Sequence, residues 1–275
     1  MTPPVPPAAG RRHPDEIAYE LELARQVQQG LLPSSLPQVE GVQVAAVNRP
    51  ARIVSGDLYD AIIIDPERLA ILCADVSGKG FPAALLAAEI QAYVRATLRA
   101  ACVFNDPTLG PIPLQVVSLL NAQAAARDAA GRYATMFFAE VDASERRLHY
   151  VNAGHNPPLL ITADGIFAGE LTTGGPPVGL LQNATYDAGT LPLPHRSTVL
   201  IYTDGVVETR SPDDEEFGLQ RLIDLCRAAH DDADALFRHV IDTLDRWRGH
   251  LEQDDDITLI AVSMGDRWNF GHPPR

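Results

Sequence analysis

The sequence has little of what marks secreted, membrane-embedded or nucleic-acid-binding proteins. Its three cysteines, Cys73, Cys102 and Cys226, lie far apart in apolar segments, which excludes a disulfide framework and argues against a zinc site. No apolar run approaches the roughly 20 residues that span a bilayer, and the first residues do not form a signal pattern. Only 22 Lys and Arg stand against 36 Asp and Glu, and this balance disfavours nucleic acids and anionic membranes as partners. We expect a cytoplasmic protein that binds another protein.

The sequence does contain enough apolar material for one large core. Hydrophobic residues make up 46% of its 275 residues, and the predicted strands and helices occur in separate blocks, which is typical of an α+β fold. The Pro-rich residues 1–14 are expected to be a disordered leader and residues 266–275 a disordered tail. Between them we expect an N-terminal linker or dimerisation helix over residues 15–33 and one folded domain over residues 34–265.

The N-terminal helix carries an apolar stripe that needs a partner. The stripe consists of Ile17, Leu21, Ala24 and Leu31, with Leu23 and Val27 beside it. Gln28 interrupts the stripe, and Pro33 is expected to end the helix. Two interpretations are equally open: the helix packs on its own domain, or it pairs with its copy in a second protomer as a short coiled coil.

The remaining pattern predicts a mixture of strands and helices. The expected strands cover residues 41–49, 61–64, 69–74, 133–141, 147–152, 159–162, 199–203 and 257–262. The expected helices cover residues 81–98, 114–126, 219–229 and 233–247. The three strands between residues 133 and 162 read as an antiparallel meander. The strand over 69–74 is apolar throughout, so both of its faces should be buried.

Acidic residues stand at the ends of several of these strands. Asp75 follows the strand over 69–74, Asp204 follows the one over 199–203, Asp57 precedes the one over 61–64, and Asp255 lies just before the last strand. Carboxylates brought together in this way repel one another and would partly protonate unless a multivalent cation neutralised them. Their hard oxygen atoms favour magnesium or manganese.

Seven short motifs occur in the order known from one protein family. They are Leu31-Leu-Pro33, Ser55-Gly-Asp57, Asp75-Val-Ser-Gly-Lys-Gly80, Tyr133-Ala-Thr-Met-Phe137, Asn152-Ala-Gly-His155, Tyr202-Thr-Asp-Gly205 and Asp255-Asp-Ile-Thr258. With them the chain resembles the metal-dependent PPM serine/threonine phosphatases, in their SpoIIE-like, RsbU-type bacterial branch. The resemblance implies two stacked antiparallel sheets flanked by helix pairs, with residues 34–265 as the catalytic domain.

The resemblance also implies a site with two Mn²⁺ or Mg²⁺ ions. Asp75 would bridge both ions, the Val76 carbonyl would add a ligand, Asp204 and Asp255 would hold the second ion, and Asp57 would act largely through bound water. Such a pair lowers the pKa of a bridging water, so that hydroxide attacks the phosphoryl group in line and no covalent phosphoenzyme forms.

Asp60 and Asp256 lie close to these acids in the sequence but are better explained as turn caps or outer hydrogen-bonding partners. Where eukaryotic members carry a His thought to act as general acid, this sequence has Ser77. His155 is the tempting replacement, although a His in a Gly- and Pro-rich turn is more often structural.

Two cations near the acidic motifs have open roles. Arg52 could clamp a phosphate through its bidentate guanidinium or simply be a solvated surface residue, and Lys79 has the same ambiguity. Nucleotide binding is improbable because the glycine pattern of a P-loop is absent around Lys79.

Three functions compete at this point. The resemblance implies a phosphoserine/phosphothreonine protein phosphatase acting on an anti-sigma-factor antagonist of the STAS type. The alternatives are a non-catalytic or default-off relative that binds partners, and a two-metal phosphodiesterase, which the acidic charge disfavours.

Overall fold

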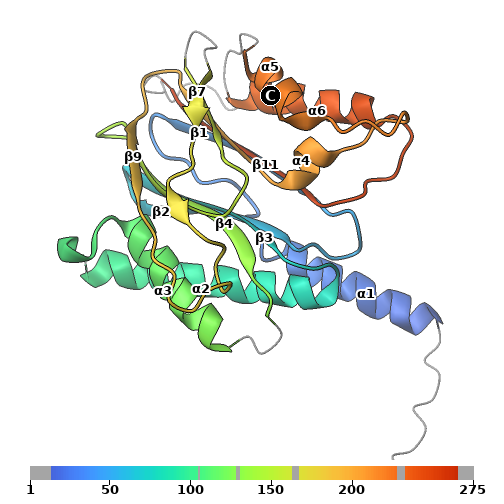
Figure 1. Ribbon diagram of the computed structural model, residues 1–275, viewed down its shortest axis with the longest axis horizontal. Helices are drawn as coiled ribbons and strands as arrows, with labels where there is room; N and C mark the ends of the chain where they lie inside the picture. The colour runs from blue at the N-terminus through green and yellow to red at the C-terminus, as the bar shows by residue number, and fades with distance from the viewer. Residues whose placement is uncertain (1–13, 105, 128–130, 163–166, 228–232, 266–275) are drawn as a thin grey trace, which may run out of the picture.

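Two β-sheets stack face to face at the centre of the molecule, and helices cover the outer face of each sheet (Figure 1). The computed structural model describes residues 14–104, 106–127, 131–162, 167–227 and 233–265. The predicted tail and all of the predicted leader except Pro14, the first residue of a helix, lie outside these ranges. The predicted α+β sandwich is therefore confirmed.

The first sheet joins strands from both halves of the chain. Its order is β1 (Val42–Arg49), β11 (Ile257–Met264), β10 (Thr198–Tyr202), β6 (Leu159–Ile161) and β7 (Phe167–Glu170). Helices α5 (Gly218–Arg227) and α6 (Ala233–Arg248) cover its outer face, and the short helix α4 (Asp204–Glu208) follows β10 directly (Figure 1). Every residue of β11 is buried, because this strand lies inside the sheet and has a layer on each side.

The second sheet is built mainly from the middle of the chain. Its order is β2 (Asp57–Asp65), β3 (Arg68–Val76), β4 (Ala134–Asp142), β5 (Arg147–Ala153) and β8 (Gly174–Gly175), and β9 (Gly189–Pro192) also pairs with β5. Its outer face is covered by α2 (Phe81–Phe104) and α3 (Ile112–Arg127), which the 3₁₀ turn Pro107–Leu109 connects. The two-residue strand β8 runs parallel to β5, which is the one departure from antiparallel pairing among the described strands.

Alternation along β3 explains its unbroken apolar sequence. Leu69, Ile71 and Cys73 belong to the cluster between the sheets. Leu72 and Ala74 belong to the cluster under α2 and α3. Because successive side chains point to opposite faces, Asp75 continues the series that enters the space between the sheets. The strand itself thus directs this carboxylate to the junction of the two sheets.

Three expectations about the strands and turns are wrong. Leu159–Ile161 does not complete a meander but crosses to the first sheet, where it pairs with β10. Asp57 is the first residue of β2 rather than part of a turn before it, because it pairs with Asp75 of β3. Asp204 starts the helix α4 rather than a simple turn. For β6 and for Asp57, long-range strand pairing outweighs the local propensity of Asp, Pro and Gly for turns.

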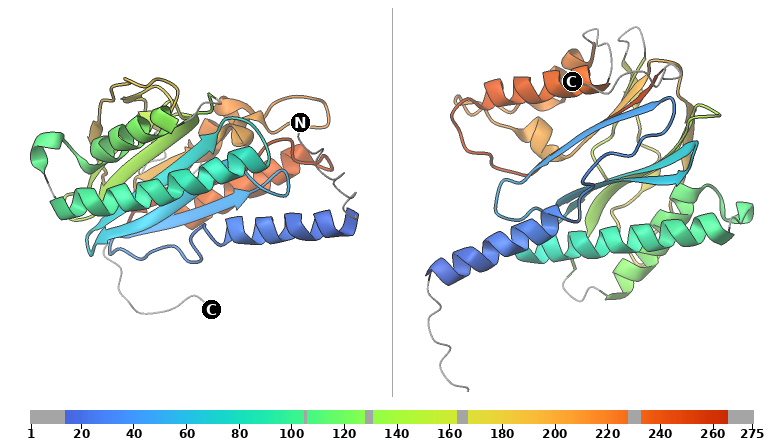
Figure 2. Two further views of the ribbon diagram at one scale, coloured as in Figure 1. Left: turned by 90° about the horizontal axis from the view of Figure 1, so that it is seen from below. Right: turned by 180° about the vertical axis from the view of Figure 1, so that it is seen from behind.

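Helix α1 (Pro14–Gln29) begins where predicted, ends before Pro33 is reached, and projects from one end of the body (Figure 2). Leu21, Ala24 and Leu31 are half-buried, whereas a neighbouring apolar stripe of the helix is exposed. The exposed stripe consists of Tyr19, Leu23 and Val27, which are 66%, 42% and 69% exposed. The side chain of Ile17 lies outside the described residues. None of the described helices has both the length and the apolar character that crossing a membrane would require.

Candidate metal centre

The four predicted carboxylates meet at one end of the sandwich. Asp57 and Asp75 are directly opposed on β2 and β3 of the second sheet. Asp204 and Asp255 come from the first sheet, at the end of β10 and just before β11. Burial raises the pKa of Asp75 to about 7, and the charges of Asp204 and Asp255 contribute to this rise. The two sheets therefore bring together acids that are distant in the sequence.

Asp57 is held by two threonines of the first sheet. It is 4% exposed, and its Oδ2 accepts hydrogen bonds of 2.7 Å from the hydroxyls of Thr203 and Thr258. Burial and the neighbouring charge of Asp75 raise the pKa of Asp57 well above its usual value. Because one of its oxygens already accepts two hydroxyl groups, Asp57 is suited to an outer role, in line with the expectation that it acts through bound water.

The roles of Thr203 and Thr258 were missed in the sequence. Thr203 occupies the N-cap position of α4, but its hydroxyl makes no capping hydrogen bond. It donates a hydrogen bond to Asp57 instead. Both threonines lie within the quoted motifs around Asp204 and Asp255, and this was the available signal. Gly205 in the first of these motifs is required by close packing, since a Cβ there would lie 2.1 Å from the carbonyl oxygen of Asp256.

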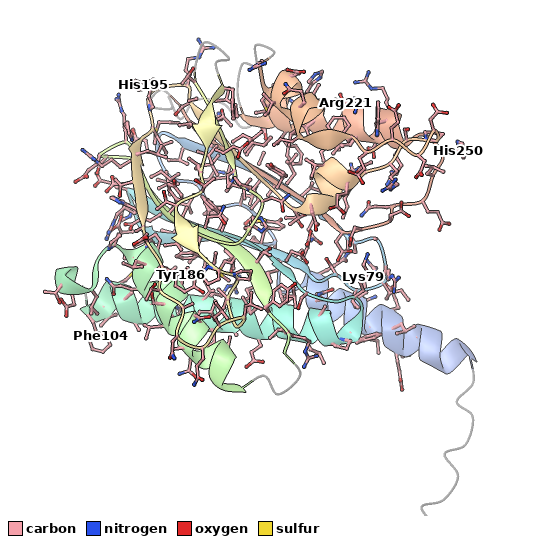
Figure 3. All side chains as sticks on the ribbon, in the orientation of Figure 1. Lys79, Phe104, Tyr186, His195, Arg221 and His250 are labelled. Atoms are coloured by element: carbon pink, nitrogen blue, oxygen red, sulfur yellow. The ribbon has the colours of Figure 1, made fainter. Side chains whose placement is uncertain are left out.

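Asp255 forms an ion pair with Lys79, whose Nζ lies 2.9 Å from Asp255 Oδ2. Lys79 is half-exposed, and this contact with Asp255 raises its pKa. Burial and the charge of Asp255 raise the pKa of Asp204. Lys79 lies at the end of the molecule from which α1 projects, far from His195 (Figure 3). A cation of the protein itself thus neutralises one of the expected metal ligands.

The donor chemistry of this site fits a hard divalent cation, although the cage is not closed. Among the described residues, no three His, Cys, Asp or Glu side chains lie close enough together to hold an ion. Asp57 and Asp75 are directly opposed on neighbouring strands, and Asp255 pairs with Lys79. Carboxylates this close together repel one another unless a cation neutralises them. Burial and the charges of Asp204, Asp255 and Asp256 raise the pKa of Asp75, and a divalent cation at this place would favour its charged form.

Asp256 organises the backbone around this site, as expected of an outer partner. Its Oδ1 accepts a 2.7 Å hydrogen bond from the Ala51 amide, and its Oδ2 accepts hydrogen bonds from the Ser55 hydroxyl at 2.7 Å and the Gly56 amide at 2.8 Å. The Gly56 carbonyl in turn accepts a 3.3 Å hydrogen bond from the amide of Val76, the predicted carbonyl ligand. Asp256 therefore ties the segment before β2 to the end of β3.

Asp60 lies on the opposite face of β2 and takes no part in the cluster. Its carboxylate pairs with Arg95 at 2.6 Å and accepts a 3.2 Å hydrogen bond from Gln91, both on α2. Gln91 also donates to the Leu31 carbonyl at 2.9 Å. Asp60 thus belongs to the attachment between α2 and the segment that follows α1.

The position of His155 disfavours a role as general acid. It is 4% exposed, and burial lowers its pKa to about 4, so the imidazole is neutral near pH 7. Ser77 is engaged with the backbone of Tyr133 through two hydrogen bonds of 2.9 and 3.0 Å. Arg52 is exposed, and its charge acts to lower the pKa of the nearby Lys79. The structure therefore provides cations near the acids but no buried proton donor among these candidates.

Comparison with known proteins agrees with this architecture. Residues 65–265 match the family described as Stage II sporulation protein E (SpoIIE). The chain is 35% identical to protein IcfG of Synechocystis sp. over 267 residues, which cover 88% of this chain and 41% of IcfG. It is 31% identical to the phosphoserine phosphatase RsbU of Bacillus subtilis over 251 residues, which cover 90% of this chain and 70% of RsbU. The chain therefore spans less than half the length of IcfG.

Solved structures show the same fold. The SiaA-PP2C domain of Pseudomonas aeruginosa superposes with a TM-score of 0.75 at 23% identity, covering 92% of this chain and 98% of that domain. RsbX in complex with magnesium superposes with a TM-score of 0.56 at 17% identity, covering 84% of this chain and 99% of RsbX. Together with the family match, these likenesses identify both the fold and the family. The chain belongs to the SpoIIE family, which its likeness to RsbU supports, and it has the fold of the PP2C (PPM) phosphatase structures.

Proposed function

We propose that this chain is a metal-dependent protein phosphatase that hydrolyses phosphoserine or phosphothreonine in a partner protein. The observation that carries the proposal is that Asp57, Asp75, Asp204 and Asp255 lie near one another at one end of the two sheets, close enough for their charges to interact. The match to the SpoIIE family over residues 65–265 supports it.

Each acid has a defined part in this proposal. Asp75, with the Val76 carbonyl, would hold both of two Mn²⁺ or Mg²⁺ ions, Asp204 and Asp255 would hold the second ion, and Asp57 would orient bound water. Two such ions supply a water of lowered pKa and stabilise charge on the phosphoryl oxygens. Lys79 and Arg52 provide positive charge beside the acids, where the phosphate of a substrate would have to arrive.

The substrate in this proposal is a phosphorylated anti-sigma-factor antagonist of the STAS type, in a partner-switching pathway. The likeness to RsbU, which is named a phosphoserine phosphatase, supports this choice. A homodimer through α1 belongs to the same proposal, with Tyr19, Leu23 and Val27 as the pairing stripe because these residues are exposed. A cytoplasmic location also belongs to it and is supported by the free thiols of Cys73, Cys102 and Cys226.

A default-off enzyme is the second candidate, and two observations favour it. The acids are not gathered closely enough to hold an ion among the described residues, and Lys79 occupies Asp255. In this version a partner or dimerisation would complete the metal site before hydrolysis begins.

The test is hydrolysis of a panel of phosphorylated antagonist proteins with and without Mn²⁺. Asp75→Asn and Asp204→Asn should each abolish turnover, because each change removes ligand charge, and a chelator should stop the parent reversibly. Asp254→Asn is the matched control, since Asp254 is an exposed neighbour of Asp255 with no predicted role. Near-normal turnover of the Asp75 or Asp204 variant at saturating Mn²⁺ would reject the assignment.

A further inference from the structure

Thr135 and His155 form a hydrogen-bonded pair next to Asp75 that the proposed mechanism does not use. Thr135 Oγ1 lies 2.9 Å from His155 Nδ1. Thr135 is directly opposed to Asp75 on the neighbouring strand, and Asp75 is directly opposed to Asp57 on the next. Directly opposed residues of an antiparallel pair project from the same face with Cβ atoms about 5 Å apart. Asp57, Asp75 and Thr135 therefore form one row across the second sheet, and His155 adjoins its end.

His155 is fixed in position by the turn that carries it. Its amide donates a 2.7 Å hydrogen bond to the side-chain oxygen of Asn152, whose amide group donates a 3.0 Å hydrogen bond to the Leu171 carbonyl. Gly154 has a φ of +69°, and a Cβ there would lie 2.6 Å from the ring of Pro177. Only glycine fits this left-handed, tightly packed position, so the turn holds the imidazole in one place.

The other side of the imidazole faces the end of β10 in the first sheet. Burial lowers the pKa of His155, and the nearby backbone of Tyr202 partly raises it again. Only a carbonyl among backbone groups stabilises a proton on the ring, and Nδ1 is already engaged with Thr135. The Tyr202 carbonyl therefore lies on the Nε2 side of the ring, and Nε2 has no hydrogen-bond partner among the described residues.

Strand register explains why this carbonyl is available. Thr198 pairs with Ile161 and Leu200 with Leu159, so the next pair in this ladder would join Tyr202 to Pro157. The Thr203 amide bonds to Thr258 of β11, and successive residues of a strand direct their backbone groups to opposite neighbours. The Tyr202 carbonyl therefore points to the proline, which has no N–H to donate.

These contacts decide which ring nitrogen carries the proton. A proton on Nε2 points at the Tyr202 carbonyl, whereas a proton on Nδ1 would leave both Nε2 and that carbonyl without a donor. Nδ1 therefore accepts the hydroxyl proton of Thr135. The imidazole stands between a residue beside Asp75 on one sheet and the backbone two positions before Asp204 on the other.

We propose that His155 is a positioning residue that ties Thr135 to the Tyr202 carbonyl and so sets the distance between the two halves of the metal centre. Asp75 lies in the row that Thr135 extends, and Asp204 follows the strand that Tyr202 ends. Groups that hold metal ligands from outside commonly change metal affinity when they are removed. The inference rests on the proposed function, because it assigns His155 and Thr135 to the same metal centre.

The test measures Mn²⁺ affinity by titration calorimetry on the full chain and does not depend on turnover. Thr135→Val keeps the shape of the side chain and removes the hydroxyl, and it should weaken Mn²⁺ binding about 10- to 100-fold. Thr135→Ser should stay close to the parent because it restores the hydroxyl. His155→Phe keeps a ring without nitrogens and should weaken binding as well. The double variant should lose less than the product of the two single losses, because both residues act through one tie.

The chain offers a matched control for loss of a His–Thr hydrogen bond. His149 Nδ1 lies 2.9 Å from Thr190 Oγ1 on the same sheet, but this pair is exposed and far from the acids in register. Thr190→Val should leave Mn²⁺ affinity unchanged. Melting curves in chelator show whether each variant is folded. If Thr135→Val or His155→Phe does not fold, the Mn²⁺ affinity of His155→Gln is measured in its place.

Several outcomes would overturn the inference. It is wrong if the folded Thr135 and His155 variants bind Mn²⁺ like the parent, even where they melt lower, because they would then serve stability alone. It is also wrong if Thr190→Val weakens binding equally or if Thr135→Ser fails to restore affinity. If the parent binds no Mn²⁺ at all, the proposed metal centre is wrong. If the parent and the variants bind Mn²⁺ equally well, the metal centre stands and only the role of His155 and Thr135 is wrong.

Discussion

The side-chain amide of Gln28 forms two hydrogen bonds with the backbone of Ser55. Gln28 Nε2 donates to the Ser55 carbonyl at 2.6 Å, and the Ser55 amide donates to Gln28 Oε1 at 2.9 Å. The Ser55 hydroxyl in turn donates to Asp256, and Asp57 follows two residues later. The residue that interrupts the apolar stripe of α1 is thus the link between this helix and the segment that leads into the acidic cluster.

Replacing Gln28 should loosen this link. Gln28→Ala removes two hydrogen bonds at a half-buried position, so we expect the free energy of unfolding to fall by about 1–2 kcal/mol and the Mn²⁺ affinity to fall with it. Gln29→Ala is the control, since Gln29 is exposed and its side chain accepts a hydrogen bond from the nearby Arg25 of the same helix. Urea unfolding and calorimetry decide the matter, and equal values for the two variants would contradict the proposed link.

Removing Lys79 should strengthen cation binding. Lys79 competes for Asp255, and a half-exposed ion pair of this kind contributes at most about 1 kcal/mol, so Lys79→Met should tighten Mn²⁺ binding up to about fivefold. Lys79→Arg keeps the charge and should remain near the parent. An unchanged or weaker Mn²⁺ affinity of Lys79→Met in calorimetry would show that the ion pair does not oppose the metal.

The stability of the metal-free protein should depend on pH through Asp75. Its pKa is raised from an ordinary value of about 4 to about 7, so between these values the folded state holds a proton that the unfolded state releases. The resulting stabilisation is complete below about pH 4 and is lost as the pH rises through 7. In chelator, Asp75→Asn should therefore melt close to the parent at pH 4 and above it at pH 8.

Saturating Mn²⁺ should reverse this order at pH 8. The cation binds only the folded state and should raise the melting temperature of the parent but not of Asp75→Asn. Parent melting curves that are identical with and without Mn²⁺ would show that the acids are not a metal site in the isolated protein.

The exposed stripe of α1 predicts which substitutions separate pairing from packing. Leu23→Glu with Val27→Glu should convert a dimer to a monomer at unchanged stability, because both side chains are exposed in the single chain. Leu21→Glu with Leu31→Glu should lower the melting temperature, because these positions are half-buried against the domain. Light scattering and thermal melting of both variants provide the measurement, and a parent that is monomeric at assay concentrations would reject the dimer.

Local patterns in the sequence were sufficient for most helices and strands. The alternation and length of the apolar runs predicted α5, α6 and β3 closely. They also predicted Asp75, Asp204 and Asp255 at strand ends, because a carboxylate at the end of a buried strand needs a partner that local structure does not supply. Family resemblance added the stacking of the two sheets, which periodicity alone does not specify.

Long-range contacts decided everything that depends on how the two sheets meet. Strand β6 joined the first sheet because Ile161 pairs with Thr198 of β10, a contact that no local pattern encodes. The hydroxyls of Thr203 and Thr258 reach Asp57, and Lys79 reaches Asp255, only because strands distant in the sequence pair in one register. Propensity and periodicity act over a few neighbouring residues, whereas hydrogen bonds and charges act between whichever groups the fold brings together. The sequence by itself therefore determined which acidic residues stand at the strand ends, and the tertiary structure decided which groups touch them.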